Sequence, residues 1–503
     1  MALTKQHLKE TDTERSPLLH NNENIQTGNN ISIQSTNGTH EDSKCSDSQN
    51  SPPYSVTRVK VVMGIAMALY AVSQGPISQI MSQYLMWRIG RDDPNYANIS
   101  TSGANTSACD SDDKTNSSST SSDKYDQLQA QVSDMMEYLS YVNSLTAMVM
   151  AIFISSSSDY VGRRTTFIIA FTGMSINMIL QTLIVCFHLP LWIYYIAVGI
   201  GGLTGAWFSV VISFLSVTAD ITKGTSSRVL WVTIVAAMFN VSSAGSVICI
   251  GFIIQNSNYE LAISIACVSV ILAYIVIVVF LPETCPKPEE KAKYNPIVGI
   301  KQLLSFFIFD GTLRKKLTFS VLLLMFLLVA MKDGSLDVMD TLYQLHQPFC
   351  WSPSMIGYYK ALKQGCSQFL MVFLLKFLQT CGIKDDYIAL VGLLFQTGQF
   401  VLEGLAATTW QLLLVPVIGI QGYLVIPTLR ALMSTLAAPD KQGALFGSIC
   451  VVEALGAFVS SALYNSVYSA TVFTFPGSVY LVMAGCNLLA FFLFFVYLKV
   501  KED

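Results

Sequence analysis

The feature that most constrains this chain is a series of apolar runs of about 20 residues that recurs from residue 60 nearly to residue 500. A helix rises about 1.5 Å per residue, so each run is long enough to cross the roughly 30 Å hydrocarbon core of a bilayer. The composition agrees, because 52% of the residues are hydrophobic and only 13% are charged, which excludes an ordinary soluble protein. We therefore predict an all-α membrane protein with about twelve transmembrane helices. The predicted spans are 61–85, 138–157, 165–187, 190–218, 229–254, 259–281, 317–344, 354–379, 387–407, 411–434, 443–468 and 477–499.

Basic residues predict the orientation of these spans. Lys and Arg recur in alternate loops, whereas the loops between them carry almost none, and basic loops favour the cytoplasmic side. Both termini are therefore expected in the cytoplasm, as an even number of spans also requires. The basic positions are Arg163, Arg164, Lys223, Arg228, Lys287, Lys291, Lys293, Lys301, Arg314, Lys315, Lys316, Lys376, Lys384, Lys441, Lys499 and Lys501.

The connections between spans predict four regions. Residues 1–57 are rich in Asn, Ser, Thr and Gln and are expected to form a disordered cytoplasmic tail. A cytoplasmic linker at 282–316 divides the spans six and six, into an N-terminal bundle (58–281) and a C-terminal bundle with a short tail (317–503). Within the first bundle, a polar luminal loop is expected at about 88–138.

Two sets of short motifs accompany these regions. The luminal loop carries three sequons, which we expect to be glycosylated at Asn98, Asn105 and Asn116. In the tail, Glu14, Leu18 and Leu19 form an E-x-x-x-L-L pattern that resembles an acidic dileucine sorting signal, for which a clathrin adaptor is the expected partner. The alternative is a chance match, since such short motifs are common.

Charged residues inside the predicted spans gather in the second half of the chain. Each costs on the order of 3 kcal/mol at the bilayer centre, so each is a functional candidate. In the seventh span, Asp333, Asp337 and Asp340 follow an i, i+4, i+7 spacing, which predicts one acidic helical face able to take up and release protons. Lys332 is expected to point toward another helix. Alternatively, Asp337 and Asp340 are ordinary surface acids at the luminal mouth. The other intramembrane charges are Lys360, Lys363, Glu403, Arg430 and Glu453.

Arg430 follows a predicted break in the tenth span. Pro427 removes a backbone donor from the helical ladder and exposes backbone groups along a cavity. The guanidinium is then placed to hold a carboxylate substrate, or to pair with Glu453 or an acid of the seventh span. The alternative is an arginine that extends to the cytoplasmic surface.

The loop between the second and third predicted spans reads Asp159-Tyr-Val-Gly162-Arg163-Arg164. It resembles the D-x-x-G-R-R loop of major facilitator superfamily transporters, which implies the major facilitator fold of two six-helix bundles. The alternative is an ordinary positive-inside loop. Asp159 opposes the macrodipole at the end of its helix, so we expect it to face an arginine or another helix N-terminus, such as the start of the eleventh span near Gly443.

Several runs of the second half follow the order and spacing of a known family: 341–351, 356–358, 427–434, 442–446 and 464–471, with 83–88, 159–164 and 219–220 in the first half. They are similar to solute carrier family 46, the family of the proton-coupled folate transporter. The resemblance implies a disulfide between Cys109 and Cys350, and a role for Arg430 in substrate binding and proton coupling. It also implies an aspartate at Asp220, whereas Ala236 departs from the acidic residue expected there.

These observations predict a secondary active transporter of an organic anion, coupled to protons and working by alternating access. Its cargo is expected to be folate-like, a steroid conjugate or muropeptide-like, and its membrane lysosomal, endosomal or plasma membrane. The alternative is a receptor or adaptor on a transporter scaffold. No enzyme motif, metal site, cofactor or nucleic-acid partner is indicated. The predicted substrate and proton-coupling residues are Arg430, Asp333, Glu453, Asp337 and Lys332, and the predicted gating residues are Asp159, Gly162, Arg163, Arg164 and Asp220.

Overall fold

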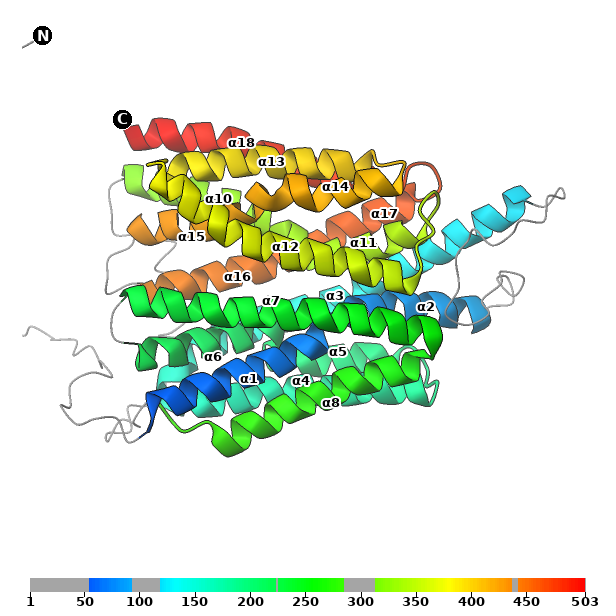
Figure 1. Ribbon diagram of the computed structural model, residues 1–503, viewed down its shortest axis with the longest axis horizontal. Coiled ribbons are helices and arrows are strands. Elements are labelled where there is room, and N and C mark those ends of the chain that lie inside the picture. Colours follow the sequence, from blue (N-terminus) through cyan, green and yellow to red (C-terminus); the bar gives the residue numbers. More distant parts are fainter. Residues whose placement is uncertain (1–53, 93–117, 223–224, 285–312, 437–441, 503) are drawn as a thin grey trace, which may run out of the picture. The chain divides into compact units, whose positions relative to one another are not determined.

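The computed structural model describes residues 54–92, 118–222, 225–284, 313–436 and 442–502, and in these ranges every regular element is a helix (Figure 1). The all-α prediction is confirmed for this part of the chain. The first half contains α1 (Val56–Gln74), α2 (Ile77–Asp92), α3 (Ser118–Val161), α4 (Arg163–Cys186), α5 (Ile193–Leu203), α6 (Ala206–Ile221), α7 (Thr225–Asn256) and α8 (Tyr259–Phe280). The second half contains α10 (Leu313–Ala330), η2 (Met331–Gly334), α11 (Leu336–Leu345), α12 (Pro353–Thr380), α13 (Asp385–Gly404), α14 (Thr409–Gly419), η3 (Ile420–Leu424), α15 (Val425–Leu436), α16 (Gln442–Ser460), η5 (Ser461–Asn465), α17 (Ser466–Thr471) and α18 (Ser478–Glu502).

Ten helical segments of the described chain are long and apolar enough to cross a membrane. Several of them join two helices, as α1 and α2 do over Val56–Asp92. The prediction of about twelve spans also needs α3 and α12, which are 44 and 28 residues long but are not among the ten. The count of twelve therefore stays a prediction.

The prediction of a polar loop over 88–138 is wrong for its second part. Helix α3 begins at Ser118, because its first turns carry an apolar stripe at helical spacing that includes the buried side chains of Tyr125, Leu128 and Val132. Residues 93–117, with Asn98, Asn105, Cys109 and Asn116, lie outside the described residues, as do Glu14, Leu18 and Leu19 of the tail.

The two ends of the helix bundle differ in how the halves of the chain pack. We call them the Arg163 end, where α1 and α4 begin, and the Cys350 end, where α2 and α11 finish (Figure 1). At the Cys350 end, one hydrophobic core contains residues of both halves, including Tyr84, Tyr194 and Tyr359. Toward the Arg163 end, one core lies within 59–281 and another within 319–497, and a small cluster of Ala151, Ile212 and Cys450 joins the halves. Among the described residues, the halves therefore share their largest common core at the Cys350 end.

Three spans of the second half depart from α-helical geometry. The seventh changes to a 3₁₀ turn at η2, the tenth at η3, and the eleventh to a π-helical turn at η5. At η2, a side chain on Gly334 would meet the backbone of Ala457 at 2.8 Å, so α16 lies against a position that only glycine fits. Such irregular turns occur at functional sites of membrane helices, where backbone groups line a cavity.

Candidate functional site

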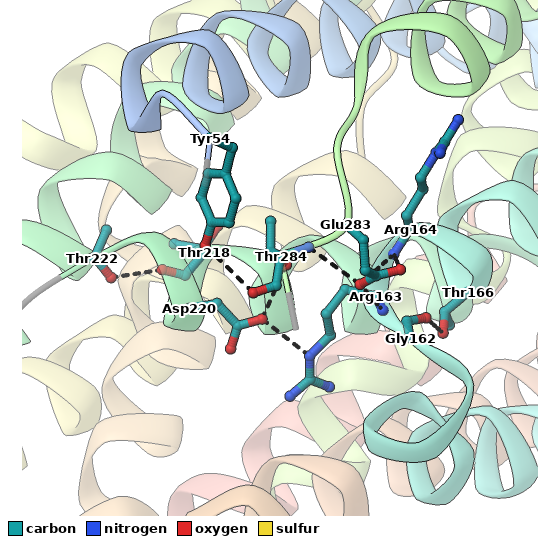
Figure 2. Close-up of polar contacts among 10 residues, drawn as sticks. All are labelled: Tyr54, Gly162, Arg163, Arg164, Thr166, Thr218, Asp220, Thr222, Glu283 and Thr284. Carbon is teal, nitrogen blue, oxygen red and sulfur yellow. Dashed lines mark hydrogen bonds and ion pairs between the residues drawn. The ribbon is translucent and has the colours of Figure 1, made fainter. Parts of the chain in front are cut away.

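At the Arg163 end, the first turn of α4 is capped by a carboxylate from a distant part of the chain. Gly162 has a φ of +101°, which favours glycine, and this turn presents the first N–H groups of α4 to Glu283. Glu283 accepts hydrogen bonds from the backbone N–H of Arg163 at 2.8 Å and of Arg164 at 3.3 Å, as Figure 2 shows. A carboxylate here satisfies unpaired donors and complements the helix dipole.

The side chains around this cap tie α4 to α6 and to the segment after α8. The Arg163 guanidinium lies 3.2 Å from a carboxylate oxygen of Asp220, and the same oxygen accepts the Thr284 hydroxyl at 3.1 Å (Figure 2). Arg164 instead donates to the Val278 carbonyl at 2.6 Å. Burial and the nearby carboxylates of Asp220 and Glu283 raise the pKa of Tyr54, so its hydroxyl keeps its proton.

Four of the five predicted gating residues are therefore brought together: Gly162, Arg163, Arg164 and Asp220. Helix α16 begins at Gln442, as expected, but the side chain of Asp159 and those at the start of α16 are not described, so their contact stays a prediction. Glu283 was not among the predicted gating residues. The sequence feature that could have indicated it is a lone carboxylate directly after the apolar run that ends at Pro282.

We expect Glu283→Ala to lower the stability of the folded protein by about 1–2 kcal/mol, because the first N–H groups of α4 lose a charged cap. The measurement is the melting temperature of the detergent-purified protein. Glu260→Ala is the matched control, because α8 is capped within its own segment by Asn258, which accepts the Leu261 N–H at 3.2 Å. Equal melting temperatures for Glu283→Ala and the wild type would contradict the capping role.

Deeper in the second half, Arg430 of α15 forms an ion pair with Glu453 of α16, one of its predicted partners. The Arg430 side chain is 41% exposed and that of Glu453 is 18% exposed. Asp333 of η2 interacts electrostatically with both. Three predicted site residues therefore lie together. The pairing with Glu453 favours a role for Arg430 in this site over the alternative of an arginine that extends to the cytoplasmic surface.

The prediction that Lys332 meets another helix is wrong. Its ammonium pairs with the adjacent Asp333, because the chain leaves α-helical geometry at η2. The prediction that Asp333, Asp337 and Asp340 share one helical face is also wrong. The 3₁₀ turn and Ser335 interrupt the helical period, so Asp333 and Asp337 are exposed while Asp340 is 1% exposed.

Asp340 belongs to a buried charge cluster that was not among the predicted site residues. The Lys363 ammonium donates to Asp340 at 2.7 Å and to Glu403 at 3.2 Å. The hydroxyl of Tyr480 donates to Asp340 at 3.0 Å, and that of Tyr359 donates to Glu403 at 3.1 Å. The cluster thus joins α11, α12, α13 and α18, and the surface-acid alternative is wrong for Asp340. The sequence indicated this cluster only by placing the charged residues Asp340, Lys363 and Glu403 inside predicted spans.

Polar contacts between the two halves accompany the shared core at the Cys350 end. Lys360, one turn from Lys363 on α12, donates to the Ser78 hydroxyl of α2 at 3.0 Å. His346 Nε2 lies 2.9 Å from an Asp126 carboxylate oxygen of α3. Gln129 donates to the Leu342 carbonyl at 3.1 Å. The described structure is therefore closed at the Cys350 end.

Cys350 is disulfide-bonded, and the other cysteines whose side chains are described are free, so its partner is a cysteine whose side chain is not described. Pairing with Cys109 stays a prediction. We expect peptide mapping without reductant to recover one cross-linked fragment that contains Cys109 and Cys350, and reductant to release both. Recovery of Cys109 as a free thiol, or of Cys350 bonded to another cysteine, would contradict the pairing.

Comparison with known proteins decides the family. The sequence profile of the Major Facilitator Superfamily matches residues 125–461. The chain belongs to the Major Facilitator Superfamily. It is a multi-pass membrane transporter and not an enzyme, as its relatives also are.

The predicted resemblance to solute carrier family 46 is confirmed by two relatives. One is the lysosomal proton-coupled steroid conjugate and bile acid symporter SLC46A3 of Gallus gallus, 26% identical over 84% of this chain and 90% of the relative. The other is the proton-coupled folate transporter of Rattus norvegicus, 22% identical over 69% of this chain and 75% of the relative.

Solved structures confirm the major facilitator fold. The crystal structure of the human organic anion transporter MFSD10 (TETRAN) has a TM-score of 0.54 at 17% identity and covers 88% of this chain and 100% of that one. A POT family transporter in complex with 5-aminolevulinic acid has a TM-score of 0.61 at 12% identity, covering 88% of this chain and 96% of that one.

Proposed function

We propose that this transporter moves an organic anion by alternating access, with protons as the coupled ion. The observation that carries the proposal is the Arg430–Glu453 pair, in which a half-exposed guanidinium is held by a single internal carboxylate. A substrate carboxylate or sulfate offers the same charge and the same two acceptor oxygens as Glu453. Substrate and Glu453 therefore compete for Arg430.

That competition supplies a coupling mechanism. Protonation of Glu453 removes its charge and releases Arg430 for the substrate anion, so a proton and an anion bind together. When the proton leaves, the Glu453 carboxylate again attracts Arg430 and displaces the anion. Asp333 lies within electrostatic reach of both groups and favours the proton-loaded state, because like charges favour neutralisation.

The relatives support a class of cargo and a membrane. Their names describe steroid conjugate, bile acid and folate transport with protons, and one of them is lysosomal. We therefore propose that this chain also transports an organic anion and lies in an endolysosomal membrane. A disulfide at Cys350 favours an oxidising compartment at that end, which leaves the Arg163 end and both termini in the cytoplasm.

The test is uptake into liposomes that contain the purified full-length protein. Estrone 3-sulfate, taurocholate and folate are offered with the outside acidic or at equal pH. We expect at least one anion to accumulate faster with the acidic exterior, and a protonophore to abolish the difference. Uptake equal to that of empty liposomes for all three would contradict organic anion transport, and uptake insensitive to the pH gradient would contradict proton coupling.

A further inference from the structure

We propose that the buried cluster of Asp340, Lys363 and Glu403 is a second proton-binding site, separate from the Arg430–Glu453 pair, with the proton carried on Glu403. This inference rests on the proposed proton-coupled transport and assigns the residues of this cluster a part in it. The site lies at the Cys350 end, where α11, α12 and α13 meet.

The charges of the cluster do not balance without a proton. One ammonium, Lys363, contacts two carboxylates, and the side chains of Asp340 and Glu403 are each 1% exposed. Lys360 forms no ion pair with either carboxylate, because its ammonium donates to the Ser78 hydroxyl at 3.0 Å and to the backbone carbonyl of Asp337 at 3.1 Å. Within hydrogen-bonding distance, one lysine therefore stands against two buried carboxylates. Because an unpaired buried charge is costly, one proton is needed for neutrality.

The hydrogen bonds indicate which oxygen holds that proton. Both oxygens of Asp340 accept a bond, one from Lys363 and one from Tyr480. On Glu403, Oε1 accepts from Lys363 and Tyr359, whereas Oε2 is buried and has no hydrogen-bond partner in the described part of the chain. A buried carboxylate oxygen without a donor is the least stabilised part of the anion, so Oε2 is the site of protonation.

Among the described residues, no further cation near Glu403 removes the need for a proton. On the elements packed against α13, the titratable groups near the cluster are otherwise phenols, which are neutral, and α14 carries no titratable side chain. Arg430 of α15 is engaged by Glu453 instead. The facing groups are Asp340 and Tyr343 of α11, Tyr359, Lys360 and Lys363 of α12, Tyr423 of η3 and Tyr480 of α18.

The position of the cluster links the proton to the closed end of the transporter. Lys360 lies one helical turn from Lys363 and donates to Ser78 in the other half of the chain. Loss of the proton adds a negative charge beside Lys363, one helical turn from the lysine that makes the Ser78 contact. Opening of the Cys350 end brings water to Glu403, so the proton exchanges with that side of the membrane.

The direct test is pH-difference infrared spectroscopy of the full-length protein in liposomes without substrate. A protonated carboxylic acid has a carbonyl stretch that neither carboxylate nor amide shows. We expect the wild type to show such a band, and Glu403→Gln to lose it. We also expect Asp340→Asn to lose it, because Lys363 then balances Glu403 alone and no proton is needed. Glu453→Gln is the control, since it leaves this band in place.

The results distinguish failure of the second proton site from failure of the proposed proton coupling. A band unchanged in both Glu403→Gln and Asp340→Asn would overturn the second site. If one of these variants does not fold, the other still decides, because each removes one of the two carboxylates. A wild type whose anion uptake ignores pH would overturn the proposed coupling, while the spectrum would still test the proton site.

Transport then tests whether the site is coupled. With estrone 3-sulfate as the probe, we expect Glu403→Gln to lose the acceleration of uptake by an acidic exterior and to keep exchange of internal for external estrone 3-sulfate. A merely structural role would lower both rates together. An unchanged response of Glu403→Gln to the pH gradient, in a wild type that is driven by it, would overturn the coupling role.

Discussion

Arg430→Ala is expected to abolish acid-driven uptake of estrone 3-sulfate and taurocholate while the protein keeps its normal abundance in the membrane. Arg430 is the half-exposed cation of its cluster, and its loss removes a charge-assisted contact to the substrate anion and leaves Glu453 without a partner. Loss of a hydrogen bond to a charged group costs about 1.5–3 kcal/mol, or about 10-fold or more in affinity. The measurement is the initial rate of uptake into liposomes, normalised to reconstituted protein.

Two variants sharpen that result. Arg430→Lys keeps the charge but loses the planar fork, so we expect intermediate uptake. Arg91→Ala is the matched control for the loss of one arginine, because Arg91 stacks on Trp87 at the Cys350 end, away from Glu453. Unimpaired uptake by Arg430→Ala would contradict a role for Arg430 in substrate binding.

Lys363→Met is expected to destabilise the fold by about 3–5 kcal/mol, because it leaves the buried Asp340 carboxylate without its cation and Glu403 without one of its hydrogen-bond donors. The measurement is thermal unfolding of the purified protein, together with the yield of folded protein from membranes. Lys376→Met, on the same helix α12 but exposed, is the control and should behave as the wild type.

A double variant separates the charge from the packing of the lysine. Lys363→Met/Asp340→Asn removes one carboxylate with the lysine and leaves Glu403 able to hold a proton, so we expect it to recover much of the lost stability. If Lys363→Met and the double variant are equally unstable, the loss comes from packing and not from the uncompensated charges.

The sequence predicted the fold well because its signals are local. Apolar runs of spanning length require only counting, and the tight turn at Gly162 requires only a glycine before two arginines. Three departures arose where a neighbour in space decides the result. Glu283 caps α4 across 120 residues of chain. The break at η2 depends on α16 packing against Gly334. Because of this break, Asp340 lies in the buried cluster and not on the predicted acidic face.

The candidate site was predictable to a similar extent. Arg430 was expected to hold a substrate carboxylate or to pair with Glu453 or an acid of the seventh span, and in the structure it pairs with Glu453. The partners of Lys363 were not predictable, because its two carboxylates reach it from α11 and α13, two helices whose rotation relative to α12 the sequence does not reveal. Charge alone marked the residues as important, and packing decided which of them meet.

The common core at the Cys350 end also determines how a solute on that side is bound. To admit it, the aromatic residues that both halves contribute must separate, so only the fraction of molecules in which they have separated can bind. The apparent dissociation constant measured from that side is the intrinsic constant divided by this fraction. Substitutions that trim the shared core, such as Tyr84→Ala, should therefore strengthen apparent binding from the Cys350 side while leaving every residue around Arg430 unchanged.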